Sequence, residues 1–216
     1  MPSTPSTKQT RSHGRSDEFP RLLAGRLCLD FVNTVEDPFD TALDFLHDYS
    51  DLARWVWHAR AIDDGELRRL KAAAKKSPQL AERVFAEAVG LRQMLEHVFR
   101  AIAGGEEPTA ADIEHLQQQH LEGLSAASVV REGRQYRWSW RGVNDLRLPL
   151  WRVIESAVEL LTEGDLSRVR ACPGADDCGW LFYDTSRNGT RRWCSMEGCG
   201  SRVKMRRHYA RQKQYS

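Results

Sequence analysis

Apolar side chains recur at helical spacing through most of the first 164 residues. Positions three or four apart lie on one face of a helix, so a repeated apolar stripe predicts an amphipathic helix packed on a core. The clearest stripe predicts a helix that starts at Ser77-Pro78, with a capping hydroxyl and proline at the first helical position, and ends at Gly104-Gly105. Its members are Leu80, Val84, Leu91, Leu95, Val98 and Ile102.

Shorter stripes predict four further helices. Each has the caps or stops that commonly bound helices. One is capped by Ser50 and reaches Ala59, one covers residues 66–75, one opens with Thr109 and Asp112 as a capping box, and one carries Trp151, Ile154, Val158 and Leu161 before Gly164.

Two segments do not follow the helical pattern. Residues 27–34 alternate partly and fit either a strand or the start of a helix, because short apolar runs are ambiguous. Residues 129–140 predict a hairpin around Glu132-Gly133, in which Tyr136, Trp138 and Trp140 share a face that we expect to join the core. The expected fold class is α+β, with a mostly helical N-terminal α/β domain that contains a small sheet.

Composition is typical of a soluble protein, with 41% hydrophobic and 29% charged residues. No run approaches the roughly 20 apolar residues of a membrane span. Residues 1–18 are rich in Ser, Thr, Pro and Arg, so we expect a disordered tail and no signal peptide. We therefore expect a cytoplasmic protein without membrane contact, built from a main domain over 19–164 and a small module over 165–216.

Four of the five cysteines lie within 28 residues, in the pattern C-x5-C-x15-C-x4-C. Four thiolates close a tetrahedral zinc shell and leave no position for water, so Cys172, Cys178, Cys194 and Cys199 predict one structural Zn²⁺. The alternative is a set of unrelated buried or redox cysteines. Cys28 stands apart and is expected in the core as a small hydrophobic side chain.

The segments around these cysteines predict a treble-clef finger. Residues 180–183 and 191–193 flank Asn188-Gly189 and predict a hairpin between the two cysteine pairs, and a helix is expected from Ser201 to about Lys213. A module of this size has little core, so metal binding is expected to supply most of its folding energy. We expect loss of a zinc ligand to unfold the finger and leave residues 19–164 folded.

Several motifs resemble a known pair of domains. The finger motifs are Cys178-Gly179-Trp180-Leu181-Phe182, Ser186-Arg187-Asn188, Arg191-Arg192-Trp193-Cys194-Ser195-Met196 and Cys199-Gly200-Ser201-Arg202, which resemble the CGNR zinc finger. Residues 29–34 and 160–168 resemble the ABATE domain that accompanies that finger. The resemblance implies an α/β N-terminal domain, a treble-clef finger and a bacterial transcription regulator. Ser201 stands where the finger's name has Asn, and either side chain can hydrogen-bond to nearby backbone.

Charge is distributed unevenly along the chain. Residues 1–164 hold 21 Lys and Arg against 25 Asp and Glu, a net charge of −4, whereas residues 165–216 hold 11 against 5, a net charge of +6. A basic module with clustered arginines is typical of phosphate binding, so we expect double-stranded DNA as the partner. The candidate contacts are Arg187, Arg191, Arg192, Arg202, Lys204, Arg206, Arg207 and Arg211. A solvated basic face is the alternative, and Arg187 and Arg192 could instead pair with Asp184 or stack on tryptophan.

The N-terminal domain offers fewer chemical signals. Asp30 and Asn33 are polar residues in an apolar run, and they are candidates for ligand binding or for fixing a turn. No nucleophile elbow, phosphate loop or His-Glu metal motif is present, so we do not expect an enzyme. The layout favours a domain that senses a small molecule or forms a homodimer. Two alternatives stay open: an RNA- or protein-interaction module, and an enzyme with an active site around Asp30 and Asn33.

Overall fold

The computed structural model describes residues 19–37, 40–174 and 178–214, so the expected tail over residues 1–18 lies outside the described part. Within it, a mostly helical N-terminal region with small antiparallel sheets precedes a cysteine cluster, which confirms the α+β class. The helices are α1 (Leu27–Val32), α2 (Tyr49–His58), α3 (Asp64–Lys76), α4 (Pro78–Gly104), α5 (Ala110–Ser125), α6 (Leu148–Glu163) and α7 (Ser201–Gln214). The strands pair as β1 (Val35–Asp37) with β2 (Asp40–Asp44), β3 (Ser128–Glu132) with β4 (Gln135–Ser139), and β5 (Val169–Ala171) with β6 (Leu181–Tyr183).

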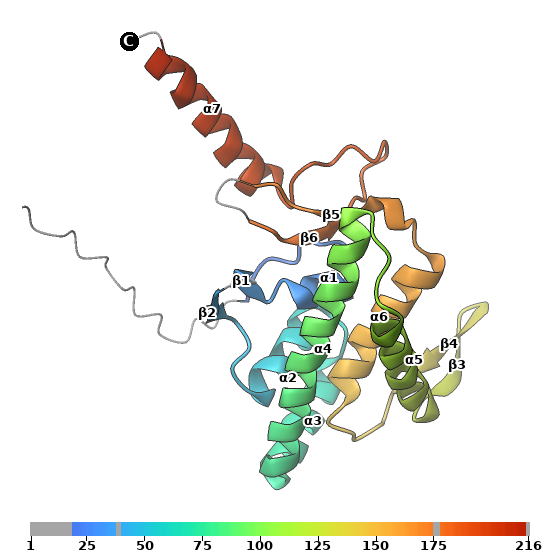
Figure 1. Cartoon of the computed structure of the whole chain (residues 1–216). Coiled ribbons are helices and arrows are strands. Elements are labelled where there is room, and N and C mark those ends of the chain that lie inside the picture. The colour runs from blue at the N-terminus through green and yellow to red at the C-terminus, as the bar shows by residue number, and fades with distance from the viewer. Residues whose placement is uncertain (1–18, 38–39, 175–177, 215–216) are drawn as a thin grey trace, which may run out of the picture.

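Helix α4 is the central element of the molecule (Figure 1). It contacts α1, α2, α3, α5 and α6, and at its C-terminal end it contacts β5 and β6. The predicted stripe is confirmed, because Val84, Leu95 and Val98 are fully buried. Pro78 is the first helical residue, and the helix ends at Gly105 in the left-handed conformation.

The start of α4 differs from the prediction in one respect. Ser77 precedes Pro78 as expected, but its side chain makes no capping hydrogen bond. Ser77 also ends α3, where its N–H donates to the carbonyl of Ala73. One residue therefore ends one helix and begins the next: its N–H bonds to α3, and its carbonyl accepts from the N–H of Ala81 in α4.

The ambiguous segment is helix α1, followed by a turn at Asn33 and Thr34. Neighbouring elements surround it: α4, α6 and β6 all contact this short helix. Its apolar positions show no single stripe because almost every side is covered, and Leu29 and Phe31 are buried. Cys28 is buried as expected, and that burial raises the pKa of its thiol to about 12.

The starts of α2, α3 and α5 are capped by acidic or hydroxyl side chains. Asp48, and not Ser50, caps α2, where it accepts from the N–H of Asp51 at 2.9 Å. Thr109 caps α5 as predicted, accepting from the N–H of Asp112 at 3.1 Å. No helix in the described ranges is long and apolar enough to cross a membrane.

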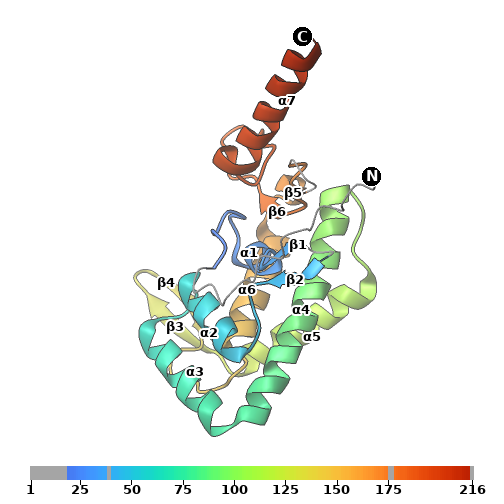
Figure 2. The same cartoon turned by 90° about the vertical axis from the view of Figure 1, so that its left-hand side faces the viewer.

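The β3–β4 hairpin forms as predicted, but its aromatic face does not join the core. Tyr136 is 70% exposed and Trp138 is 44% exposed, because the hairpin projects beyond α5 and α6 (Figure 1) and its tip stays free in the turned view (Figure 2). Trp140, just beyond the strand, is buried and donates from Nε1 to the carbonyl of Gly123 at 2.7 Å. The core prediction was wrong for the first two aromatic residues and correct for the third.

Candidate metal centre and basic helix

The four clustered cysteines converge on one point. Their Sγ atoms all lie within 4.8 Å of one another. The Sγ atoms of Cys178 and Cys194 are 3.7 Å apart, and those of Cys194 and Cys199 are 3.6 Å apart. Zn–S bonds of about 2.3 Å place the sulfurs of a tetrahedral site about 3.8 Å apart, whereas a disulfide needs about 2.05 Å. The four cysteines are thus spaced to bind one zinc ion.

The first cysteine pair lies at the open end of the β5–β6 sheet. Cys172 follows β5, and its N–H donates to the carbonyl of Trp180 at 2.8 Å. Gly174 passes beneath the cluster so closely that an added Cβ would lie 2.8 Å from the Sγ of Cys199. The second pair spans the single π-helical turn of residues 196–200 that leads into α7.

The predicted hairpin between the two cysteine pairs is wrong. β6 pairs antiparallel with β5, upstream of the first cysteine, so that Val169 faces Tyr183 and Ala171 faces Leu181. Residues 184–193 form a loop and not the second strand of a hairpin. The Asn188-Gly189 turn signal is real, since Gly189 has positive φ, but it belongs to this loop.

The electrostatics of the cluster favour a bound cation. Hydrogen bonds from the thiols of Cys178 and Cys194 and from the Cys194 N–H lower the pKa of the Cys172 thiol to about 4. The same contacts raise the pKa of Cys194, because an ionised neighbour opposes a second negative charge. A divalent metal removes this conflict by stabilising all four thiolates. The donor set therefore fits a closed, structural zinc site.

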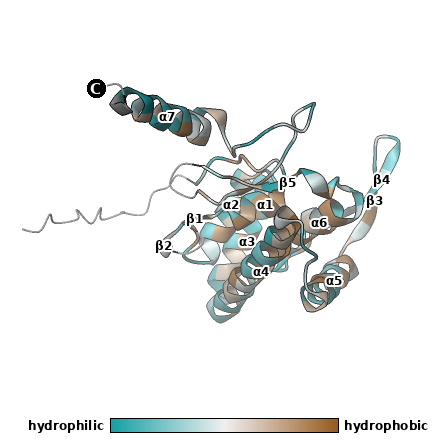
Figure 3. Cartoon of the chain, turned by 45° about the horizontal axis from the view of Figure 1, so that its top comes forward, coloured by the Kyte–Doolittle hydropathy of each residue, from teal (hydrophilic) through white to brown (hydrophobic). Residues whose placement is uncertain are grey.

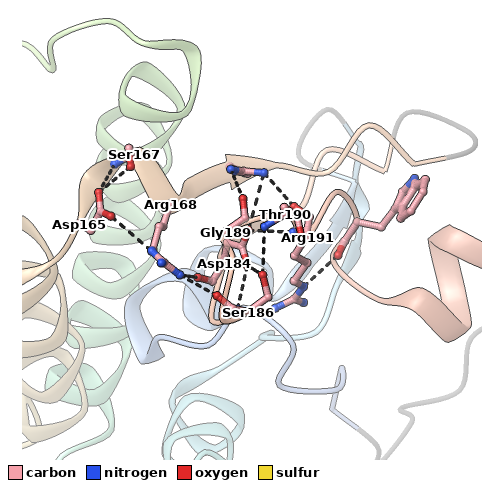
Figure 4. Close-up of polar contacts among 10 residues, drawn as sticks. Asp165, Ser167, Arg168, Asp184, Ser186, Gly189, Thr190 and Arg191 are labelled. Carbon is pink, nitrogen blue, oxygen red and sulfur yellow. Dashed lines mark hydrogen bonds and ion pairs between the residues drawn. The ribbon is translucent and has the colours of Figure 1, made fainter.

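A buried carboxylate organises the loop between the cysteine pairs (Figure 4). Asp184 is fully buried, and its Oδ1 accepts from the N–H and hydroxyl of Ser186 at 2.9 and 2.6 Å. Its Oδ2 accepts from the N–H of Arg191 at 2.8 Å. Burial alone would raise the pKa of Asp184, but these hydrogen bonds and the charge of Arg170 hold it below its usual value.

Two arginines that precede or lie in β5 close the loop from the other side. Arg168 donates to the carbonyls of Asp184 and Ser186 at 3.0 and 2.9 Å. Arg170 donates to the carbonyls of Gly189 and Arg191 at 2.8 and 3.1 Å. Neither arginine was predicted from the sequence to organise the finger. The Asp-x-Ser pattern at 184–186 is typical of a turn closed by a side chain, and it was the one signal in the sequence for an ordered loop here.

Arg191 faces inward, although it was expected on the nucleic-acid surface. Its guanidinium donates to the carbonyls of Leu23, Trp193 and Cys194, the first at 2.7 Å and the second at 3.0 Å. It also stacks over the Phe182 ring, 4.6 Å from its centroid. This side chain ties a zinc-ligand segment to the chain before α1, so we leave it out of the basic surface.

Asn33 joins the N-terminal domain to the finger, and Asp30 holds the segment before α1. The Asn33 amide donates to the carbonyl of Leu181 at 2.8 Å and accepts from its N–H at 3.0 Å, as a neighbouring strand would. Asp30 accepts from the N–H of Ala24 at 2.9 Å, and its burial raises its pKa from 3.8 to about 6. Because both side chains are engaged internally, we do not carry them forward as ligand-binding residues.

The other candidate basic residues lie at the surface. Lys204, Arg206, Arg207 and Arg211 are exposed on α7. Arg202, also exposed, donates to the Sγ of Cys199 at 3.4 Å and so borders the metal centre. Arg187 is exposed on the 184–193 loop, and Arg192 stacks on Trp193 at 5.4 Å. The hydroxyl of Ser201 donates to the carbonyl of Met196 at 3.0 Å, the local backbone contact expected for a residue that replaces Asn.

Comparison with known proteins agrees with this geometry. No curated protein sequence matches the chain significantly. The family model for the CGNR zinc finger matches residues 168–212, which include all four clustered cysteines. The ABATE family model, described as "Putative stress-induced transcription regulator", matches residues 25–164. The chain therefore belongs to the ABATE family and carries a CGNR zinc finger after its ABATE domain.

Proposed function

We propose that this protein regulates transcription by binding double-stranded DNA through α7, with a zinc-organised finger that holds this helix in place. The regulatory role is supported by the description of the matched family, "Putative stress-induced transcription regulator", and the DNA contact is our inference from the structure of the finger. In this proposal residues 165–216 form the finger, residues 19–164 form a sensory domain that binds a small-molecule effector, and the protein works in the cytoplasm. Homodimer formation through residues 19–164 would suit a two-fold DNA site.

The observation that carries the proposal is the surface of α7. Residues 201–214 contain six Lys and Arg and no Asp or Glu. Among residues 201–212 every side chain is exposed except that of Val203, which is half-buried. The helix extends away from the rest of the molecule and is mostly hydrophilic in the view of Figure 3. A helix exposed along almost its whole length has little core to pack against, and its six positive charges without an acidic residue suit a phosphate backbone.

The metal's part is positional. Cys172, Cys178, Cys194 and Cys199 would hold zinc, which would supply four strong bonds and no open coordination site. Cys199 lies one turn before the first basic residues of α7, and Arg202 donates to its Sγ. Because both the 184–193 loop and α7 diverge from this point, the cluster sets the direction in which Arg187, Arg192 and the helix arginines project.

A salt series of DNA affinity tests the proposal. For a short mixed-sequence duplex, log Kd should depend linearly on log salt concentration, with a slope that reports the number of phosphates neutralised. Replacing Arg206, Arg207 and Arg211 with Gln should reduce that slope by about 2 to 3, because each lost phosphate contact removes about 0.9. Arg202 is left intact, since its contact with Cys199 would confuse loss of DNA binding with loss of the metal site.

A matched control separates α7 from overall charge. Arg68, Lys76 and Arg83 are exposed on α3 and α4, and their replacement with Gln gives the same change in net charge. The control should keep the wild-type slope. Equal slopes for both triple variants would refute α7 as the DNA contact. If only the α7 variant loses slope, genomic footprinting of the wild type would identify the bound sites.

The interaction-module alternative has one observation in its favour. Met205 and Tyr209, one turn apart on α7, are 56% and 58% exposed, which also suits a protein partner. Competition decides between partners: RNA that displaces the duplex at equal salt would favour an RNA role. An unchanged DNA affinity after loss of the α7 arginines would favour a protein partner instead.

The enzyme alternative has weaker support. His47 lines a cavity of about 930 Å³ and its Nδ1 lies 3.1 Å from Oδ2 of Asp51. That carboxylate, however, accepts from the backbone N–H of His47 at 3.2 Å and so closes the turn before α2. The matched families are a regulator and a zinc finger and not enzymes.

A further inference from the structure

A second cavity, of about 500 Å³, lies where α6 meets the start of α3 and the β3–β4 hairpin. Its lining is strongly charged and brings together segments far apart in the chain. Four guanidinium groups contribute to it, from the α2–α3 loop, from β4 and the loop after it, and from α6: Arg60, Arg137, Arg141 and Arg152. Four carboxylates balance them, so the lining carries no net charge: Asp63, Glu66, Glu155 and Glu159.

Some of these charges are already used within the protein. Asp63 and Glu66 form the capping box of α3, in which each carboxylate accepts from the other's backbone N–H. Arg137 forms an ion pair with Glu132. These contacts account for half of the lining acids and one of the four arginines, and they fix the cavity wall.

The remaining charges have weak partners or none. In the described part of the chain, the guanidinium groups of Arg60 and Arg141 make no hydrogen bond or ion pair. Arg152 lies over Trp140, 5.0 Å from the ring centroid, and its buried Nε has no hydrogen-bond partner. Glu155 pairs loosely with Arg152 at 3.6 Å. Burial and the neighbouring charge of Glu159 raise the pKa of Glu155, with Arg152 opposing them.

The backbone at the cavity wall fixes where Arg60 lies. Arg60 has φ of 58°, and it is the single non-glycine residue with positive φ in the described ranges. It follows the C-cap of α2, where the N–H groups of Arg60 and Ala61 donate to the carbonyls of Trp57 and Val56, so its left-handed conformation ends that helix as a Schellman motif. Glycine is the usual residue at such a position, and arginine here places a guanidinium beside the cavity.

We infer that this cavity binds a zwitterionic small molecule of the free α-amino acid class. A carboxylate on the ligand would pair with the guanidiniums of Arg60 and Arg141, and an ammonium group would pair with Glu155 and Glu159 on α6. A ligand of one sign would meet four groups of its own sign, whereas a ligand with both signs satisfies both sets. The volume falls within the usual range for small-molecule sites.

The position of the cavity suits the sensory role that we propose for residues 19–164, and the inference rests on that role. Leu27, the first residue of α1, lines the cavity, and so does Ser156, whose hydroxyl accepts from the N–H of Cys28. The same short helix carries Asp30 and leads into Asn33, which bind the segment before α1 and the finger strand β6. A ligand in the cavity would therefore contact the helix that the finger is fastened to.

Binding is tested on the full-length, zinc-loaded protein in the absence of DNA. The probes are the free α-amino acids, screened by thermal shift and then by isothermal titration calorimetry. We expect at least one to bind saturably, and its N-acetyl and carboxamide derivatives to bind at least tenfold more weakly. Because no DNA is present, failure of the α7–DNA contact would leave this result unaffected.

Variants locate the site. Arg141→Gln and Arg60→Gly should each weaken binding at least tenfold, and glycine at position 60 suits the observed φ. Arg83→Gln, on the exposed surface of α4 and outside the cavity lining, should bind as wild type. Absence of binding by every amino acid, equal binding of the derivatives, or equal loss in Arg83→Gln would overturn the inference.

Discussion

The N-terminal domain and the finger are stabilised by different kinds of contact. In the N-terminal domain, α4 is held by apolar side chains such as Val84 and Val98, which are fully buried. In the finger, the backbone from residue 184 to 194 makes few regular ladder contacts, and side chains bind its carbonyls and N–H groups instead. Arg168, Arg170 and Arg191 supply donors, and Asp184 supplies acceptors.

This difference follows from the small size of the finger and from the need to pair every buried backbone group. A buried backbone group must be paired, and a short irregular segment cannot pair with itself. The 184–193 loop therefore depends on charged side chains, whereas helices of the N-terminal domain satisfy their own backbones and need only an apolar surface. The two schemes meet at Asn33 and Arg191, where single side chains of one region bind the backbone of the other.

Removal of one zinc ligand should give the largest effect and tests whether the two regions are separable. Cys194→Ser loses one of four metal ligands, and structural zinc sites contribute about 10–16 kcal/mol of apparent binding free energy. Hydrogen exchange should accelerate throughout the finger. It should also accelerate in residues 23–33, because their partners Leu181 and Arg191 become disordered, while α4 stays protected. From the sequence, residues 19–164 were expected to stay folded as a whole after loss of a zinc ligand. The contacts of Asn33 and Arg191 predict instead that residues 23–33 lose protection with the finger.

Cys28→Ala is the control for that experiment, since Cys28 is buried outside the cluster. It should retain one zinc per chain by metal analysis, with finger protection unchanged. Unaltered exchange of residues 23–33 in Cys194→Ser would show instead that the N-terminal domain folds without the finger.

Asn33 is expected to have the next largest effect. Asn33→Leu keeps the approximate volume but leaves the N–H and carbonyl of Leu181 without their partner. Each buried unpaired group costs about 1–3 kcal/mol, so the loss of both partners should lower the free energy of unfolding by roughly 2–6 kcal/mol in denaturant titrations. Asn188→Ala, in the exposed loop, should change it by less than about 0.5 kcal/mol. Equal effects at the two positions would remove Asn33 as the junction.

Asp30 should make stability depend on pH. Its pKa is raised from 3.8 to about 6 by burial, so the folded state keeps the proton to higher pH than the unfolded chain does. The stabilising contribution is therefore complete below about pH 3.8 and is lost as pH rises through about 6, with a total on the order of 2–3 kcal/mol. Asp30→Asn should flatten the free energy of unfolding over this interval, measured by urea titration at each pH. Glu107→Gln, at an exposed carboxylate, should leave the wild-type slope, and an unchanged slope in Asp30→Asn would contradict the assignment.

Sequence patterns predicted the regular parts of this molecule better than its junctions. The apolar stripe of α4 and the zinc cluster were both foreseen, because each depends on spacing within a short stretch. The partner of β6 was assigned incorrectly, since pairing with β5 depends on which neighbour the folded core presents. The Asn33–Leu181 contact joins residues 148 positions apart and leaves no periodic trace. The exposure of Tyr136 and Trp138 was missed because face alternation within a hairpin does not reveal whether anything covers that face.

The projecting α7 also has a mechanical consequence. With 14 residues at about 1.5 Å each, it forms a lever arm of about 21 Å anchored at its first turn beside Cys199. A tilt of about 10° at this anchor would sweep the far end through roughly 4 Å, close to the 3.4 Å rise between successive bases of a DNA strand. A shift at the cysteine cluster too small to disturb the core could therefore move the far end of α7 by about one base step, and Arg211 by somewhat less.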